Sequence, residues 1–400
     1  MASSDERRRA KRARTHLSSY RASRRAHTLH PDPDWRDWAN DLSAGPAGLI
    51  AERVLSNDVA DYVRFRAVCR AWRASSPEPR EHDVFDCRFH PRRWIMVPRV
   101  SGVGNRRSFL NLSTGECIHV RLRGLRHRHY LFGSTSEGLV VLCRKDTLVV
   151  ELVNPLTGQR ADLPRATSLL FPSTTSTSTS TSMAHKIDDG FRVRSAGLAG
   201  DSTVALHYGS AAIAVAKPGD ECWTQLGPVE NFKSAMSFAG RFYCVTFKNI
   251  LVLETAMAAN RPPELVVALD FKRGFLWSDL VHLVDKEGEL ILVHCVDYPT
   301  RDYFDGWYSA YRVNLEKRNM VPMPRLGRHT LFMGMDRSLL SMMSERVSPS
   351  VMANIVYVCY KYDKRTGRSK VVAIDPEDGC SEPKFPRGDI GGYLSRCVCS

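Results

Sequence analysis

Few residues of this 400-residue sequence have the types and spacing that could do chemistry. His127 and His129 lie two residues apart in a basic stretch, and Cys397 and Cys399 have the same spacing near residue 400. A closed zinc site needs four nitrogen, sulfur or carboxylate ligands. The histidines have no nearby carboxylate, and C-x-C is the wrong spacing for such a site. We therefore expect no metal ion at either pair.

The sequence also lacks the short motifs of common enzymes. It contains no Walker loop, no H-E-x-x-H, no G-x-S-x-G and no dinucleotide glycine fingerprint. A glycan-processing enzyme would need convergent acids around a central channel, and the sequence offers no such set. We therefore expect no catalytic residue, no enzymatic activity and no cofactor.

Two basic stretches are interleaved with aromatic residues. They are Arg88–Arg93, near Phe89 and Trp94, and Arg121–His129, followed by Tyr130. Positive charge beside stacking surfaces can bind phosphate or RNA. No recognised nucleic-acid module surrounds these stretches, however, which favours a strand start and a surface loop. Nucleic acid is thus not expected as a partner.

The net charge of +14 is concentrated at one end of the chain. Residues 1–30 hold nine Lys or Arg against two acids, which accounts for half of it. Residues 1–34 lack apolar periodicity and are expected to be a disordered basic tail. Its cluster is of the nuclear-localisation type, although a simple solvated tail is the alternative. The candidate signal residues are Arg7, Arg8, Arg9, Lys11, Arg12 and Arg14.

Cysteine usage and hydropathy indicate the compartment. The 11 cysteines form no C-x-x-C pair, and several lie inside apolar strand-like runs. This pattern is typical of reduced, buried thiols in the nucleus or cytoplasm. No run of about 18 apolar residues exists, so we expect no membrane span.

Residues 35–80 predict three short helices. Pro46 suits the first turn of the first helix. Ser56 and Asn57 interrupt the pattern and can cap the second helix, with Asp58 in its first turn. So short a unit buries little apolar surface alone, so a partner or the next domain should complete it. The apolar side chains spaced along this segment are Leu49, Ile50, Val54, Leu55, Val59, Tyr62, Val63, Val68 and Trp72.

From residue 83 to residue 400 the pattern changes to short apolar runs separated by Gly, Pro, Asn and Asp, and long helical patterns are absent. A strand followed by an Asn/Asp-containing turn recurs at Asn111, Asn154, Asn314 and Asp363. A period of about 40–50 residues is typical of a β-propeller, and generic hairpins of another β fold are the alternative. The fold class is therefore mainly β, with a propeller-like domain after the helices. The Ser/Thr-rich segment 170–185 predicts a disordered loop.

The helical segment resembles a plant F-box, most specifically in the ending V-C-R-A-W-R at 68–73. The chain after it resembles the plant F-box-associated family of KIB type. The resemblance rests on R-F-H-P-R-R-W at 88–94, F-L-N-L-S-T-G-E at 109–116, S-E-G-L-V at 136–140, L-V-N-P-L-T-G at 152–158 and L-P at 163–164.

The resemblance implies a substrate-recognition adaptor of an SCF-type (cullin–RING) ubiquitin ligase. The helices would bind a Skp-type adaptor and the propeller would hold a protein target. The usual Leu-Pro opening is replaced by A-G-P-A-G-L at 44–49. The alternative is a propeller protein-binding module whose degenerate F-box is only a helical lead-in. The residues implied for adaptor binding are Leu42, Pro46, Leu49, Ile50, Val54, Leu55, Val63 and Trp72.

Overall fold

The structure is a computed structural model that describes residues 44–97, 106–122, 125, 128–170, 191–200, 202–255, 261–296, 299–300, 303–304, 307–334, 338–341, 350–363, 368–381, 383, 385 and 389–399. Several sequence predictions fall outside these residues. They are the basic tail with its nuclear-signal cluster, Leu42, and residues 171–185 of the Ser/Thr-rich segment.

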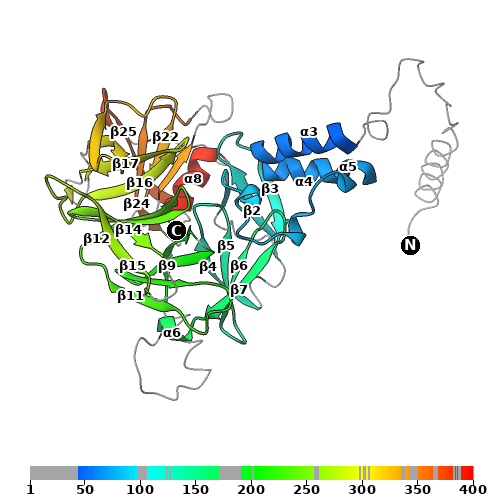
Figure 1. Ribbon diagram of the computed structural model, residues 1–400. Helices are drawn as coiled ribbons and strands as arrows, with labels where there is room; N and C mark the ends of the chain where they lie inside the picture. Colours follow the sequence, from blue (N-terminus) through cyan, green and yellow to red (C-terminus); the bar gives the residue numbers. More distant parts are fainter. Residues whose placement is uncertain are drawn as a thin grey trace, which may run out of the picture.

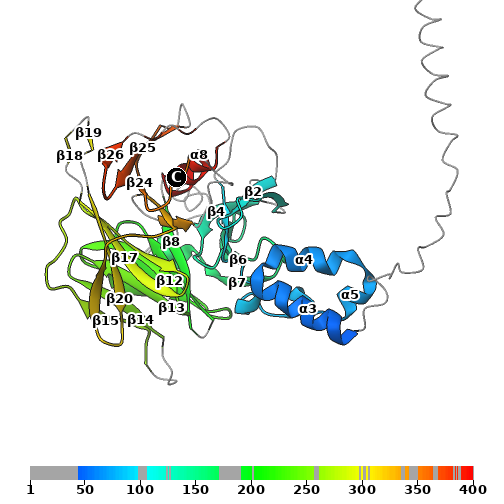
Figure 2. The same ribbon diagram turned by 90° about the horizontal axis from the view of Figure 1, so that it is seen from above.

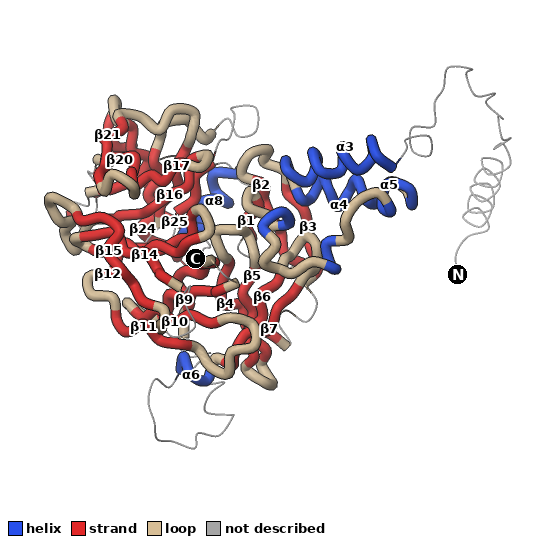
Figure 3. Tube along the Cα trace, viewed as in Figure 1, coloured by secondary structure: helices blue, strands red, loops and turns tan. Residues whose placement is uncertain are grey.

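Six β-sheets follow one another along the chain and form a six-bladed β-propeller (Figures 1 and 3). The mainly β fold class predicted from the sequence is thereby confirmed. Blade 1 contains β1 Trp94–Met96, β2 Arg106–Asn111 and β3 Cys117–Arg121. Blade 2 contains β4 His129–Ser134, β5 Val140–Arg144, β6 Val149–Val153 and β7 Arg160–Arg165. Blade 3 contains β8 Val193–Ala199, β9 Thr203–Tyr208, β10 Ala212–Ala216 and β11 Thr224–Pro228.

The remaining blades have the same antiparallel organisation, with one parallel pair in the last. Blade 4 contains β12 Phe232–Phe238, β13 Arg241–Thr246, β14 Asn249–Glu254 and β15 Glu264–Asp270. Blade 5 contains β16 Leu280–Lys286, β17 Glu289–Cys295, β20 Tyr308–Asn314 and β21 Asn319–Met323. Blade 6 has the order β23 Ser338–Ser341, β22 Thr330–Met333, β24 Val356–Asp363, β25 Arg368–Asp375 and β26 Gly379–Ser381. A small hairpin, β18 Pro299–Thr300 and β19 Tyr303–Phe304, lies between β17 and β20.

Neighbouring blades from blade 2 to blade 6 meet along their first-listed strands, β4, β8, β12, β16 and β23. A parallel bridge between Thr135 and Ala196 shows that the inner strands of blades 2 and 3 run in the same direction. Each inner blade has a neighbouring blade on both of its faces. That is why strands such as β9 are buried along their whole length and read as continuous apolar runs.

The recurring Asn/Asp-containing turn predicted from the sequence occupies the same position in successive blades. Asn154 follows β6, and its side-chain oxygen accepts hydrogen bonds from the backbone N–H groups of Leu156 and Thr157 at 3.0 and 3.2 Å. Gly158 completes the turn at φ +80°, a backbone conformation that glycine adopts without strain. Asn111 forms the equivalent turn after β2. Asp363 likewise ends the third strand of blade 6, although its turn lies outside the described residues.

The C-terminal helix α8, Ile390–Cys399, was not predicted from the sequence. Asp389 begins it by accepting a hydrogen bond from the backbone N–H of Gly391 at 2.7 Å. The expectation of strands alone up to residue 400 is wrong here, because two successive glycines hide the apolar spacing. The helix packs between the last and first blades in a cluster that includes Leu394, Cys397, Val398, Phe332, Tyr357, Val97 and Leu110.

Two further short elements complete the description. Helix α6, Thr167–Leu170, follows blade 2, and the 3-10 helices η1, Pro79–Glu81, and η2, Cys87–Phe89, lead into blade 1.

The cysteines inside apolar strand runs are buried, as predicted: Cys143, Cys244, Cys295 and Cys359. Burial raises the pKa of Cys143 to about 12, and it raises the pKa of Cys244 and Cys295 even more strongly. Because the thiolate is the reactive form, these thiols should resist a thiol reagent at about pH 8 until the protein unfolds. Exposed Cys87 and Cys222 should react in the native state. Mass spectrometry of labelled native and denatured protein checks this, and rapid native labelling of Cys143, Cys244 or Cys295 would contradict it.

Candidate protein-interaction surfaces

Three helices stand at the side of the propeller next to blades 1 and 2 (Figure 2). They are α3 Ala44–Asn57, α4 Val59–Val68 and α5 Arg70–Ala74, as the sequence predicted. The longest, α3, buries Ala47, Ala51 and Leu55, which are four residues apart and so share one face. The opposite side of α3 remains exposed.

Asp58 joins the helices to blade 1. Its carboxylate caps α4 by accepting hydrogen bonds from the backbone N–H groups of Ala60 and Asp61, at 2.6 and 3.4 Å. It also accepts from Trp94 Nε1 at 3.0 Å and from Asn111 Nδ2 at 2.9 Å. The sequence suggested that Ser56 or Asn57 would cap this helix. That prediction is wrong, because Asp58 has the extended backbone of a cap residue.

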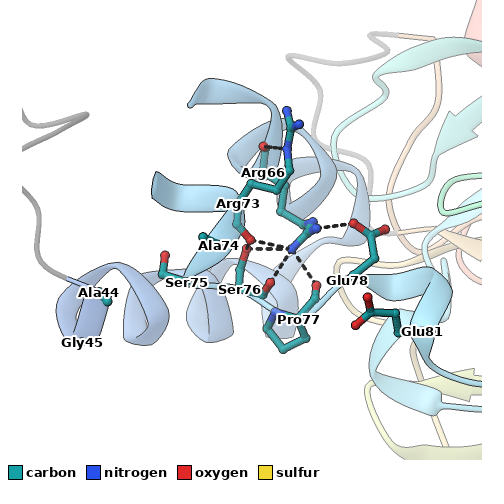
Figure 4. A pocket seen from close by; sticks show the side chains of 10 residues that line it. All are labelled: Ala44, Gly45, Arg66, Arg73, Ala74, Ser75, Ser76, Pro77, Glu78 and Glu81. Carbon is teal, nitrogen blue, oxygen red and sulfur yellow. Dashed lines mark hydrogen bonds and ion pairs between the residues drawn. The ribbon is translucent and has the colours of Figure 1, made fainter. Parts of the chain in front are cut away.

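Arg66 fixes the opposite end of the helical segment, where α5 turns back (Figure 4). Its guanidinium is buried and donates to the Arg73 carbonyl at 3.1 Å, the Ser76 hydroxyl at 2.9 Å and the Pro77 carbonyl at 2.8 Å. It also pairs with Glu78. Beside it lies a depression of about 820 Å³, in which the polar groups nearest to Arg66 are already bonded to it. These contacts hold the chain after α5 against α4.

The segment between the helices and blade 1 is tied to the turn that follows β6. Asn154 Nδ2 donates to the Phe89 carbonyl at 2.7 Å. Gln159 Nε2 donates to the carbonyls of His82 and Asp83 at 3.1 and 2.8 Å. The helices therefore adjoin the end of the propeller at which the Asn111 and Asn154 turns lie.

The residues implied for adaptor binding fall into two groups. Leu49, Ile50 and Val63 have exposed fractions of 70%, 43% and 37%, which is unusual for large apolar side chains on helices. Pro46 is also exposed. In the second group Leu55 is buried, and Val54 and Trp72 are partly buried. The Trp72 ring stacks on the Phe65 ring with 4.5 Å between their centroids. The first group can contact a partner, whereas the second supports the helices.

A second exposed apolar surface lies on blades 4 and 5. We define the tryptophan surface as Leu276, Trp277 and Trp307, with exposed fractions of 66%, 82% and 53%. Leu276 and Trp277 lie in the loop between β15 and β16, and Trp307 immediately precedes β20. Phe247 supports Trp277 in an edge-on contact at 5.8 Å.

The loop that carries Trp277 is held in place by half-buried Lys233 and buried Asp279. Lys233 Nζ donates to the carbonyls of Leu276, Trp277 and Asp279 at 2.8, 2.8 and 2.6 Å. Burial lowers the pKa of Lys233, and the Asp279 carboxylate opposes that shift. Asp279 Oδ2 accepts from the Leu276 backbone N–H and contacts His294 Nε2 at 2.9 Å. The exposed side chains are thus presented on a fixed backbone.

The helices and the tryptophan surface lie at opposite ends of the propeller. Adjacent strands in blades 2 and 4 are antiparallel, so a turn after the second strand and a turn after the third lie at opposite ends of the propeller. Phe247 follows β13, the second strand of blade 4, whereas Asn154 follows β6, the third strand of blade 2. The two surfaces are also on different blades, and Figure 1 shows α3–α5 across the ring from β12 and β15.

The tryptophan surface was not predicted from the sequence. The only signal is F-L-W at 275–277, an apolar run too short for a strand and placed between a glycine and a serine. Large apolar residues in a loop indicate either a covered core or an interaction site, and only the structure distinguishes these.

The six sheets with two exposed apolar surfaces define a β-propeller protein-binding module. The chain belongs to the KIB1-4 beta-propeller family, whose model matches residues 109–393. The KIB-type propeller predicted from the sequence is confirmed. No curated protein matches the sequence significantly. No helix among the described residues has the length and hydropathy to cross a membrane.

Solved structures resemble the chain only distantly. One is the propeller domain of Cps50 (Swd1) from Myceliophteria thermophila, with 13% identity, a TM-score of 0.31, and coverage of 72% of this chain and 78% of that one. Another is a catalytically inactive virginiamycin B lyase from Staphylococcus aureus with quinupristin, with 10% identity, a TM-score of 0.30, and coverage of 69% and 72%. TM-scores this low carry no argument about function.

Proposed function

We propose that this protein is the substrate-recognition subunit of an F-box-type cullin–RING ubiquitin ligase. The observation that supports the proposal best is the exposure of Leu49, Ile50 and Val63 on helices that Asp58 attaches to blade 1. An apolar helix face that is held rigidly and left uncovered suits a protein partner. The proposed partner is a Skp-type adaptor, and complex formation with the purified adaptor is the direct test.

The proposed role also needs a surface for the target protein. The tryptophan surface meets this need, because large aromatic side chains on a fixed backbone are typical anchors of protein interfaces. Its place at the opposite end from the helices leaves both surfaces accessible in one complex. The protein would therefore act without catalysis of its own, in the nucleus or the cytoplasm.

Replacing Trp277 with alanine should weaken target binding by about 30-fold, or about 2 kcal/mol, which is the effect of removing an aromatic anchor. Stability and adaptor binding should not change, because 82% of this side chain is exposed. The measurement is the amount of each protein that cross-links to the wild type and to the variant in cells.

The matched control is Met352→Ala, which removes an exposed apolar side chain on blade 6. If the two variants lose the same proteins to the same extent, the tryptophan surface is not the target-binding site.

One observation favours a second function. Ala60 of α4 packs into the same apolar cluster as Trp94 and Phe109 of blade 1. A helical segment that serves only to cover the propeller would show this contact too. In that case the protein is a propeller binding module outside any ligase, with an intact tryptophan surface and no adaptor complex.

A further inference from the structure

A cleft with a volume of about 810 Å³ lies on the side of the propeller between blades 1 and 2. Its walls come from the end of β3, the starts of β4 and β7, and the turn at 155–158. Arg80, which follows the helices, contributes the remaining part. A volume of this size is typical of sites for small molecules or single side-chain groups.

Four arginines line this cleft: Arg80, Arg121, Arg128 and Arg160. Arg80 is held in place because its Nε donates to the Thr157 carbonyl at 3.2 Å. Its guanidinium lies against Gly158, where a β-carbon would meet the terminal nitrogen Nη2 at 3.3 Å. The planar end of Arg80 is therefore fixed at the wall of the cleft.

Little negative charge balances these arginines. Within the described residues, Arg80, Arg121 and Arg128 form no ion pair with a carboxylate. Arg160 approaches Glu151 at 3.7 Å, but Glu151 is buried and already pairs with Arg144 at 2.5 Å. Four arginines around one cleft, with Glu151 as the one carboxylate paired to any of them among the described residues, create a positive potential.

His129 supplies an independent observation. It lines the cleft with a side chain that is only 9% exposed, and its Nε2 contacts Glu151 at 3.1 Å. Its other ring nitrogen, Nδ1, is buried and has no hydrogen-bond partner among the described residues. A buried polar atom without a partner calls for an explanation, and a bound ion that is absent from the structure is one.

We propose that this cleft binds a phosphoryl anion. Arginine donors match phosphate oxygens in pairs, and several together favour a ligand with more than one negative charge. The phosphoryl group can belong to a multiply phosphorylated small molecule or to a phosphorylated side chain of a protein. Because Arg80 follows the helices and the other arginines belong to the blades, such a ligand would also brace the helices against the propeller.

The test is isothermal titration calorimetry of the full chain with tripolyphosphate and, separately, with a doubly phosphorylated serine peptide at about 150 mM salt. We expect saturable binding at one site. The variant Arg121→Gln/Arg128→Gln/Arg160→Gln should weaken it at least about 100-fold, since each lost charged hydrogen bond is worth about tenfold or more. These side chains are exposed, so the melting temperature without ligand should stay unchanged.

The matched control is Arg241→Gln/Arg261→Gln/Arg312→Gln, which removes the same charge from exposed ion pairs elsewhere. It should leave the affinity within about twofold. If both compounds bind and compete, the cleft accepts either source; if only one binds, that result identifies the source. No saturable binding of either, an equal loss in both triple variants, or tighter cleft-dependent binding of a single-stranded RNA would each overturn the proposal.

Discussion

Replacement of Asp58 by alanine is expected to reduce the free energy of unfolding by about 3–5 kcal/mol. The loss of the cap of α4 accounts for about 1 kcal/mol. The larger part comes from the Trp94 indole N–H and the Asn111 amide, which lose their acceptor. Each buried donor left without a partner is worth about 1–3 kcal/mol. Chemical denaturation followed by tryptophan fluorescence measures this effect.

Two variants serve as controls for Asp58→Ala. In Asp58→Asn the side-chain oxygen can still cap the helix, so the loss should be smaller. In Asp61→Ala only an exposed ion pair with Arg64 is removed, so the change should stay below about 1 kcal/mol. If Asp58→Ala behaves like Asp61→Ala, the helices are not attached to blade 1 as described.

Replacement of Gly334 by alanine should open the contact that closes the ring, with a loss of about 3 kcal/mol or more. The new β-carbon would lie 2.1 Å from the Val398 carbonyl oxygen in α8. Gly334 cannot easily move away, because its carbonyl contacts His282 Nε2 at 3.0 Å. Helix α8 would have to shift and expose the apolar cluster between blades 1 and 6. Thermal unfolding and limited proteolysis after residue 381 would report this change.

Gly392→Ala is the matched control within α8. Its β-carbon would meet Phe385 at 3.6 Å, which is ordinary contact. Because glycine is about 0.5–1 kcal/mol less favourable than alanine inside a helix, this variant should be neutral or slightly more stable. Equal destabilisation by both substitutions would show that α8 tolerates no change at all, and would contradict the specific role of Gly334.

The sequence predicted the fold well because its signals are local. Asn154 and Gly158 form a turn that depends on their own backbone and side chains, and apolar runs between such turns form strands in almost any context. The three N-terminal helices lie at their predicted positions because apolar spacing is local too, although the cap of α4 is Asp58 and not Ser56 or Asn57. Which of their side chains remain exposed depends on the packing of blade 1.

Features that depend on contacts between distant residues could not be predicted. The buried position of Leu55 and the exposed position of Leu49 both fit the same helical spacing. Helix α8 gains its stability from blades 1 and 6, and its glycines mask the pattern. The tryptophan surface and the arginine cleft combine loops that lie far apart in the chain. The sequence predicts a surface loop at residues 121–129, whereas in the structure Arg121, Arg128 and His129 line the wall of this cleft.

The structure also determines how adaptor binding has to be tested. Aspartate at Leu55 would place a charge in the core of the helices and unfold them, so a lost complex would be uninformative. Leu49→Asp/Ile50→Asp changes only exposed positions. Val267→Asp/Val321→Asp places the same two charges on exposed apolar positions of β15 and β21 and is the matched control.

The most direct test of the proposed adaptor function is size-exclusion co-elution of the full chain with a purified Skp-type adaptor. We predict a one-to-one complex for the wild type and for Val267→Asp/Val321→Asp, and no complex for Leu49→Asp/Ile50→Asp with an unchanged melting temperature. Absence of a complex with folded wild type, or a complex that survives Leu49→Asp/Ile50→Asp, would contradict the proposal that these helices dock the propeller onto a ubiquitin ligase.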